Sequence, residues 1–189
     1  MRVYLAGPDV FLPDAAARAT QLRMICARHG LHGVSPLDGL AGGDPAGWVN
    51  LPEARRIALR NEAHIVSCAA LVANLTPFRG PSADAGTVFE LGFMRALGRP
   101  VFGWSNAGDS FLARTRSACT TSLQPDGTWR DAEGMLLEAF DGLADNLMID
   151  GAIIASGGTL VTRPIPAAAR WTDLAAFEAC VFAVARSVD

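Results

Sequence analysis

Residues 82–100, SADAGTVFELGFMRALGRP, decide the fold of this chain. The stretch starts with loop and capping residue types, continues with apolar residues at helical spacing over about three turns, and stops at Gly98 and Pro100. Two carboxylates stand out: Asp84 on the loop, and Glu90 in the first turns of the predicted helix. Acids here can simply complement the helix dipole, but in α/β proteins a loop that feeds a helix beyond a strand is also where ligands bind. Both acids are therefore candidate site residues.

Working outward, short apolar segments alternate with helical patterns along the whole chain. Strands are predicted at residues 2–6, 31–35, 69–75 and 100–104. Helices are predicted at about residues 14–29, 52–67, 85–97, 145–157 and 172–186. Residues 105–131 are predicted to be irregular, and their continuation to residue 140 is predicted to turn into a helix. This alternation favours an α/β, flavodoxin-like three-layer sandwich with a five-stranded, mainly parallel sheet, with residues 1–189 forming a single domain.

Composition excludes several classes of function. The formal net charge of −3 argues against a nucleic-acid partner, and all 16 basic residues are arginine, so a Schiff-base or Walker-type lysine is excluded. The glycine-rich dinucleotide and nucleotide fingerprints and the serine-hydrolase elbow are absent from the sequence. The four widely spaced cysteines form no metal-binding pattern, so we expect no metal and no cofactor. We also expect a cytoplasmic protein with no signal peptide and no membrane partner.

Four stretches in order resemble the nucleoside 2-deoxyribosyltransferase family. They are YLAGP at residues 4–8, ANLTPFRG at 73–80, DAGTVFELGFMRA at 84–96 and NLMI at 146–149. The FRG at residues 78–80 is similar to the trypanosomatid-like branch of that family. The resemblance implies a flavodoxin-like fold, a role in nucleotide salvage, and a double displacement in which a carboxylate exchanges the base of a 2′-deoxynucleoside for another free nucleobase.

The resemblance also implies roles for residues. Glu90 resembles the nucleophile, Tyr4 would orient its carboxylate, and Asp84 would bind the 5′-hydroxyl group. Asn146 and Met148 would complete the site from a neighbouring subunit, which implies a homo-oligomer. Taken alone, a single strand tyrosine such as Tyr4 is more often a packing residue with a satisfied hydroxyl.

Further substrate-binding candidates surround this set. Gly7 belongs to the YLAGP loop, and Phe78 could stack on a planar ligand or pack against a neighbouring subunit. Asn61 falls where lactobacillal relatives carry a base-side aspartate, and an amide cannot act as a general acid. Asp38, or water, is then the substitute proton donor for the leaving base.

Two alternatives stay open beside deoxyribosyl transfer. One is an N-glycosidase that hydrolyses the N-glycosidic bond of a nucleoside or nucleotide, and the other is a non-catalytic nucleoside sensor. An anionic Asp84 would repel a 5′-phosphate, which favours free nucleosides as substrates. The sequence leaves open the base preference, the tolerance of ribonucleosides and the size of the oligomer.

Overall fold

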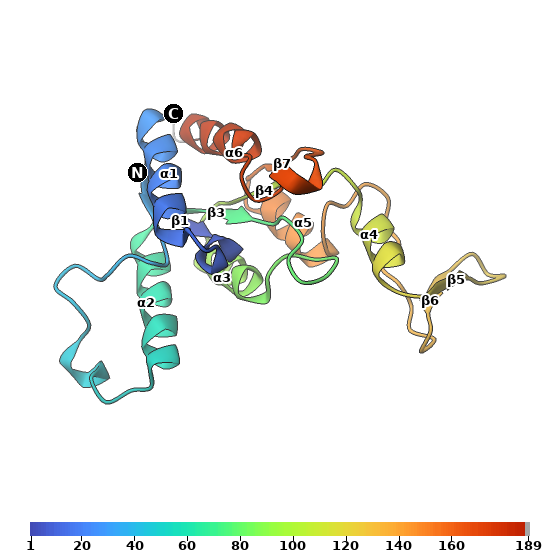
Figure 1. Ribbon diagram of the computed structural model, residues 1–189, viewed down its shortest axis with the longest axis horizontal. Helices are drawn as coiled ribbons and strands as arrows, with labels where there is room; N and C mark the ends of the chain where they lie inside the picture. The colour runs from blue at the N-terminus through green and yellow to red at the C-terminus, as the bar shows by residue number, and fades with distance from the viewer. Residues whose placement is uncertain (188–189) are drawn as a thin grey trace.

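A five-stranded parallel sheet lies between two layers of helices in this computed structural model, which describes residues 1–187 (Figure 1). The sheet has the order β2-β1-β3-β4-β7, with bounds β1 (Arg2–Ala6), β2 (His32–Val34), β3 (Ala70–Asn74), β4 (Val101–Ser105) and β7 (Leu160–Thr162). One face is covered by α1 (Ala15–Arg28) and α6 (Ala175–Arg186), and the other by α2 (Glu53–Ser67), α3 (Ala85–Ala96) and α5 (Leu147–Ala155). The predicted flavodoxin-like fold is confirmed.

The core forms two apolar layers because successive strand residues point to opposite faces of the sheet. On β1, Val3 and Leu5 pack in the layer beneath α1 and α6, whereas Tyr4 and Ala6 pack in the layer beneath α2, α3 and α5. All five residues of β3 and all five of β4 are buried, as expected for central strands of a parallel sheet. This alternation sends the side chain of Tyr4 towards α3.

The order of the strands places a topological switch point at the carboxyl ends of β1 and β3. These two strands are neighbours, with Tyr4 paired to Leu71 and Ala6 to Ala73. The chain leaves β1 for α1 on one face of the sheet and leaves β3 for α3 on the other (Figure 1). In doubly wound folds the loops diverge at such a switch point, and ligands bind in the crevice between them.

Helix α3 begins and ends as the sequence predicts. Asp84 is its N-cap, and the Asp84 carboxylate accepts a hydrogen bond of 3.0 Å from the backbone N–H of Thr87. Leu91 and Met94 are buried against the sheet. The chain turns away at Gly98, whose φ of 72° lies in the left-handed region that favours glycine.

The predictions for residues 105–140 are wrong. The segment predicted to be irregular contains α4 (Phe111–Ala118) and a hairpin of β5 (Thr121–Leu123) and β6 (Trp129–Asp131). The helix predicted to follow does not form up to residue 140. Turn chemistry explains this, because Asp131 accepts bonds from two backbone N–H groups beyond it and Gly134 adopts a φ of 83°.

Two segments extend away from the sheet and its helices (Figure 1). One is the hairpin of β5 and β6 with α4 at its base, and the other is the connection from β2 to α2, which contains the short 3-10 helix η2 (Ala46–Trp48). Neither segment contributes to the two buried layers of the main sheet, apart from its ends. Within residues 1–187, no helix is both long and apolar enough to cross a membrane.

Candidate active site

Three side chains from three elements meet beside this switch point. The Tyr4 hydroxyl, from β1, donates a hydrogen bond of 2.6 Å to Oε1 of Glu90 on α3. The Asn61 amide, from α2, donates to the same Oε1 at 3.3 Å. Both donors use one oxygen, so Oε2 of Glu90 makes no hydrogen bond within the described residues. The structure therefore brings together Tyr4, Asn61 and Glu90, three of the residues selected from the sequence.

The electrostatics of this cluster shift the pKa of Glu90 towards neutral pH. Burial raises the pKa of Glu90 to about 7, the nearby charge of Asp84 raises it too, and the bonds from Tyr4 and Asn61 lower it. Burial and the Glu90 carboxylate raise the pKa of Tyr4 far above its usual range, so its hydroxyl keeps its proton and acts as a donor. A carboxyl group with a pKa near 7 suits acid–base or nucleophilic chemistry at neutral pH.

Asp84 is placed by its capping role. Besides the Thr87 N–H, its Oδ2 atom lies 3.2 Å from the Thr87 hydroxyl, so one carboxylate oxygen is held at the start of α3. Its charge influences Glu90, less than two turns further along the same helix. The helix thus presents two carboxylates to one region, which is the arrangement that the sequence predicts.

Gly7 lies where the loop after β1 passes over the end of β3. A Cβ atom at Gly7 would lie 2.7 Å from Cβ of Asn74 and 2.9 Å from Oδ2 of Asp9, so a side chain does not fit. Asn74 itself donates a hydrogen bond of 2.7 Å to Asp9. Glycine at position 7 is therefore required for the close packing of the two loops that border the crevice.

Asp9 and Arg18 are buried polar residues that the sequence analysis missed. Burial raises the pKa of Asp9, against the opposing effects of Asn74 and of Arg18, whose Nε lies 3.8 Å from Oδ1 of Asp9. Arg18 also donates to the carbonyl oxygen of Trp171. These contacts join the loop after β1, the end of β3 and the segment before α6. The sequence gives little warning of them, because both residues look like ordinary surface residues of a turn and a helix.

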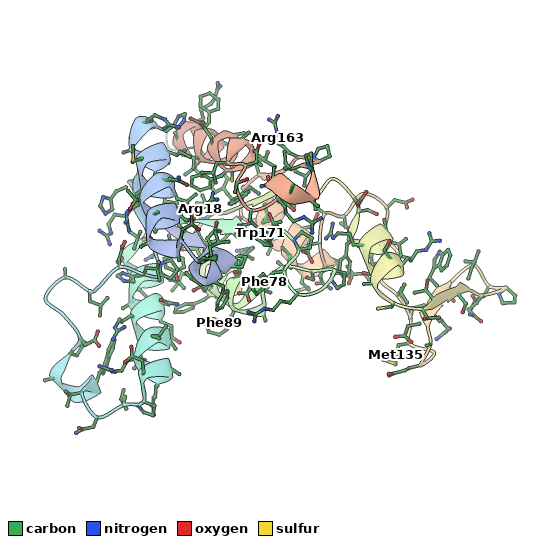
Figure 2. The ribbon with its side chains drawn as sticks, in the orientation of Figure 1. Arg18, Phe78, Phe89, Met135, Arg163 and Trp171 are labelled. Carbon is green, nitrogen blue, oxygen red and sulfur yellow. The ribbon has the colours of Figure 1, made fainter. Side chains whose placement is uncertain are left out.

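Phe78 lies on the loop after β3, in a group of aromatic side chains. Its ring stacks on Phe11 with centroids 5.4 Å apart, and meets Trp171 edge-on at 6.1 Å. Figure 2 labels Phe78 and Trp171, which lie near each other. The guanidinium of Arg79 lies over both phenyl rings, 4.5 Å from the centroid of Phe78 and 5.2 Å from that of Phe11. Phe11 ends the 3-10 helix η1 (Pro8–Phe11), so the stack joins the loops after β1 and β3.

Asn146 and Met148 lie at the start of α5, away from the hydrogen bonds of Glu90. Asn146 is the N-cap: its Oδ1 accepts from the Met148 N–H at 3.0 Å, and its Nδ2 donates to Glu138 at 2.6 Å. Met148 is 70% exposed. Both residues border an apolar groove of about 690 Å³ between α3 and α5. Within one chain, these two predicted residues face the surface of the molecule.

Asp38 is not part of the Glu90 cluster. Its carboxylate accepts a hydrogen bond of 2.5 Å from Arg23 and one of 2.9 Å from the N–H of Ser35. Among the described residues these are the hydrogen bonds of its side chain, and neither involves Glu90. The predicted role of Asp38 as a proton donor therefore gains no support from its position.

A further carboxylate, Asp145, lies just before α5 and was not among the predicted site residues. It is 1% exposed and accepts hydrogen bonds from the Ser82 hydroxyl and from the backbone N–H groups of Ala83 and Asn146. Asp145 thereby fixes the loop before Asp84 to the start of α5. In the sequence, Asp145 is marked only by its position directly before Asn146, the first residue of the NLMI stretch.

The described residues contain no cluster of three or more histidine, cysteine or acidic side chains that could hold a metal ion. The buried cysteines Cys26, Cys68 and Cys180 are free thiols, and burial raises the pKa of each. These thiols are therefore poor nucleophiles at neutral pH.

The chain is similar in sequence and in structure to several known proteins. A curated relative, an uncharacterized protein of Schizosaccharomyces pombe, is 34% identical, and the match covers 82% of this chain and 78% of that protein. A solved 2-desoxiribosyltransferase from Leishmania mexicana is 29% identical over 78% of this chain and 84% of its own, with a TM-score of 0.58. A conserved protein from Enterococcus faecalis V583 shares the fold at 21% identity, with a TM-score of 0.52 over 86% of this chain and 91% of its own.

The sequence model of one family, nucleoside 2-deoxyribosyltransferase, matches residues 3–148. That range contains Tyr4, Asn61, Asp84 and Glu90, and it ends at Met148 beyond Asn146. The match thus covers most of the chain, in agreement with the resemblance found in the sequence. This chain belongs to the nucleoside 2-deoxyribosyltransferase family.

Proposed function

We propose that this protein transfers 2-deoxyribose between nucleobases through a covalent intermediate on Glu90. The observation that carries the proposal is the hydrogen-bonding pattern of this carboxylate, whose Oε1 is held by Tyr4 and Asn61 while Oε2 is unbonded. A nucleophile needs one oxygen fixed in position and the other free to attack. A structural carboxylate in a buried site would normally have both oxygens bonded.

Two displacements complete the proposed reaction. Oε2 of the ionised Glu90 attacks C1′ of a 2′-deoxynucleoside, and the C1′–N bond breaks with its electron pair leaving on the base. A second base then attacks C1′, the ester bond to Glu90 breaks, and the new nucleoside loses a proton to solvent. The transition states resemble an oxocarbenium ion, which an adjacent carboxylate stabilises and can capture. A pKa near 7 leaves roughly half of Glu90 ionised at neutral pH.

Asp84, in this proposal, binds the 5′-hydroxyl group of the sugar. One of its oxygens is used for capping, and the other is available to accept a hydrogen bond from the substrate. A phosphate at the same place would face like charge from Asp84 and Glu90. Free nucleosides are therefore the proposed substrates, in the salvage of bases.

We also propose that a second subunit completes the site. The groove between α3 and α5 is largely apolar and includes Val88, Leu91 and Phe111, with Met148 at its border. Phe89, on the outer side of α3, is 61% exposed (Figure 2). Burying such surface against a second copy is favourable, at roughly 25 cal/mol per Å². This would bring Asn146 and Met148 of one copy towards the Asp84 and Glu90 of another.

One incubation tests the proposal. The protein is mixed with 2′-deoxyinosine and free adenine, the products are separated by liquid chromatography, and Glu90→Gln serves as the control. We expect 2′-deoxyadenosine, absent in the control. Free hypoxanthine and deoxyribose without a new nucleoside would instead indicate an N-glycosidase. Binding without any turnover, in a folded protein, would favour a sensor and contradict both enzymatic activities.

A further inference from the structure

The aromatic pair Phe11 and Phe78 lies on the two loops that diverge at the switch point, and β1, the strand before the first loop, carries Tyr4, the hydrogen-bond donor to Glu90. Phe11 follows β1 and Phe78 follows β3, the strands on either side of the switch point. The rings are nearly parallel, with 10° between their planes, and Trp171 packs edge-on against the ring of Phe78 at 90°. Asp9 and Asn74 join the same two loops below them by a buried hydrogen bond. The two loops are thus held together both by the aromatic stack and by the hydrogen bond between Asn74 and Asp9.

Arg79 lies over this stack and has an unusual backbone conformation. Its φ of 57° is the one left-handed value found at a non-glycine residue within residues 1–187. Its side chain makes no ion pair and no hydrogen bond among the described residues, and its contacts there are the faces of Phe11 and Phe78. All five guanidinium N–H donors are therefore free to bind a ligand. A planar cation on an aromatic surface also marks a place where a planar base can stack.

The leaving base needs help that the Glu90 cluster does not supply. When the C1′–N bond breaks, a neutral base leaves with a negative charge unless it is protonated. Asn61 cannot donate a proton as an acid, and its Oδ1 atom is buried without a hydrogen-bond partner, so that side of the site offers an acceptor. Asp38 is engaged by Arg23. A cationic hydrogen-bond donor would stabilise the anionic base without transferring a proton.

We propose that Arg79 stabilises the leaving nucleobase, with Phe78 as the surface on which that base stacks. The inference rests on the proposed function, because it concerns the same glycosyl transfer. The guanidinium donates hydrogen bonds to a carbonyl oxygen or ring nitrogen of the base as the electron pair of the C1′–N bond moves onto it. Water then protonates the departed base, and the proton released by the acceptor base in the second displacement restores the balance.

The test compares two leaving groups. In 2′-deoxyinosine the base leaves as an anion, whereas in 7-methyl-2′-deoxyguanosine the cationic base leaves neutral and needs no cationic partner. We expect Arg79→Gln to lower kcat/KM for 2′-deoxyinosine on the order of 10²-fold, the scale of losing one charge-stabilising donor. The same variant should change kcat/KM for the methylated substrate by less than about 3-fold, since no anion forms there.

Matched variants separate chemistry from structure. Arg186→Gln removes another exposed arginine that lies over a phenyl ring, that of Phe182, and should leave both substrates unaffected. Arg79→Lys keeps the charge but loses the planar fork, so it should recover part of the loss with 2′-deoxyinosine. Equal losses with both substrates, no loss with either, or a changed oligomeric state as the sole effect of Arg79→Gln would overturn the inference.

A binding measurement keeps the inference separate from the proposed function. If the wild-type protein turned over neither nucleoside, the proposed function would fail while the base site could still exist. Calorimetric titration with free hypoxanthine decides that case. Affinity about 10-fold weaker in Arg79→Gln than in wild type would support a base site at Arg79. Equal affinity in the two proteins, or no binding to wild type, would overturn it.

Discussion

Two carboxylates that accept hydrogen bonds from α2, those of Asp44 and Glu90, lie in opposite environments. Arg60 and Asn61 are neighbours on this helix. Arg60 binds Asp44 through two hydrogen bonds of 2.6 and 2.8 Å, whereas Asn61 binds Glu90 through one of 3.3 Å. The hydrogen bonds from Arg60 lower the pKa of Asp44, while burial raises the pKa of Glu90 to about 7.

The difference shows how one helix can border both a stably ionised acid and the acid that we propose as the nucleophile. At Asp44 the donor is a cation in contact with solvent, so the charged form is stable and both oxygens are occupied. At Glu90 the hydrogen-bonded donors, Tyr4 and Asn61, are neutral, the group is half-buried, and one oxygen is free. Neutral donors position a carboxylate without neutralising its charge, which is what the proposed attack of Glu90 on C1′ requires.

The largest expected effect comes from removing Glu90, the acid that we propose as the nucleophile. Glu90→Gln should lower the rate of deoxyribosyl transfer by about 10⁴-fold or more, because an amide cannot form the glycosyl ester. Asp44→Asn, the matched change at the inert acid, should keep the rate within about 3-fold. Steady-state rates with 2′-deoxyinosine and adenine check both. Similar losses in the two variants would remove the distinction between the acids.

The next effect concerns the stronger of the two neutral donors. Tyr4→Phe removes the 2.6 Å hydrogen bond that holds Oε1 and lowers the pKa of Glu90. The rate should fall by about 10- to 100-fold, and the acidic limb of the pH–rate profile should move to higher pH because the ionised form loses its donor. A profile of kcat/KM against pH measures the shift. A limb displaced to lower pH would contradict this assignment.

A smaller effect is expected at Asn61. Asn61→Asp replaces a donor to Glu90 with a second negative charge, which disfavours ionisation of Glu90. The acidic limb should therefore again move to higher pH, with a rate at neutral pH lower by about 10-fold. The companion variant Arg60→Gln alters the Asp44 pair and should leave the limb in place. An unchanged limb in Asn61→Asp would show that Asn61 does not influence the charge of Glu90.

The smallest effect is on stability. The pKa of Glu90 is higher in the folded than in the unfolded chain, so its contribution to stability is complete below about pH 4.5 and is lost as pH rises through about 7. Glu90→Gln should therefore raise the free energy of unfolding at pH 8 by about 1–3 kcal/mol, with little gain at pH 4.5. Urea unfolding at the two pH values measures this. A stabilisation that was equal at both values would contradict a raised pKa in the folded protein.

Much of the fold could be predicted from the sequence because its signals are local. Capping by Asp84, the apolar spacing of α3 and the buried runs of β3 and β4 each lie within a few residues. The strand β7 was not located, since three residues after a glycine pair carry no pattern of their own. The hairpin of β5 and β6 was missed because Asp and Gly turns decided its path rather than hydrophobic periodicity.

The candidate site also contains residues that have a local sequence signal and residues that have none. Glu90, Asp84 and Tyr4 were selected from motifs, and the structure adds that Tyr4 and Asn61 bind the same oxygen of Glu90. The links made by Asp9, Arg18 and Asp145 join residues far apart in the chain, and neither their spacing nor their chemical type indicates those contacts. Long-range polar contacts of this kind depend on the packed structure and have no local signature.

The covalent intermediate on Glu90 is the central claim, and trapping it is the most direct test. A 2′-deoxy-2′-fluoro nucleoside slows glycosyl transfer by destabilising the oxocarbenium-like state, so the ester should accumulate. Intact-protein mass spectrometry followed by peptide mapping locates the added group. Addition of one fluorodeoxyribosyl group to the peptide that contains Glu90, absent in Glu90→Gln, is the predicted result. Turnover of the natural substrate without any adduct on Glu90, or with an adduct on another residue, would contradict the account.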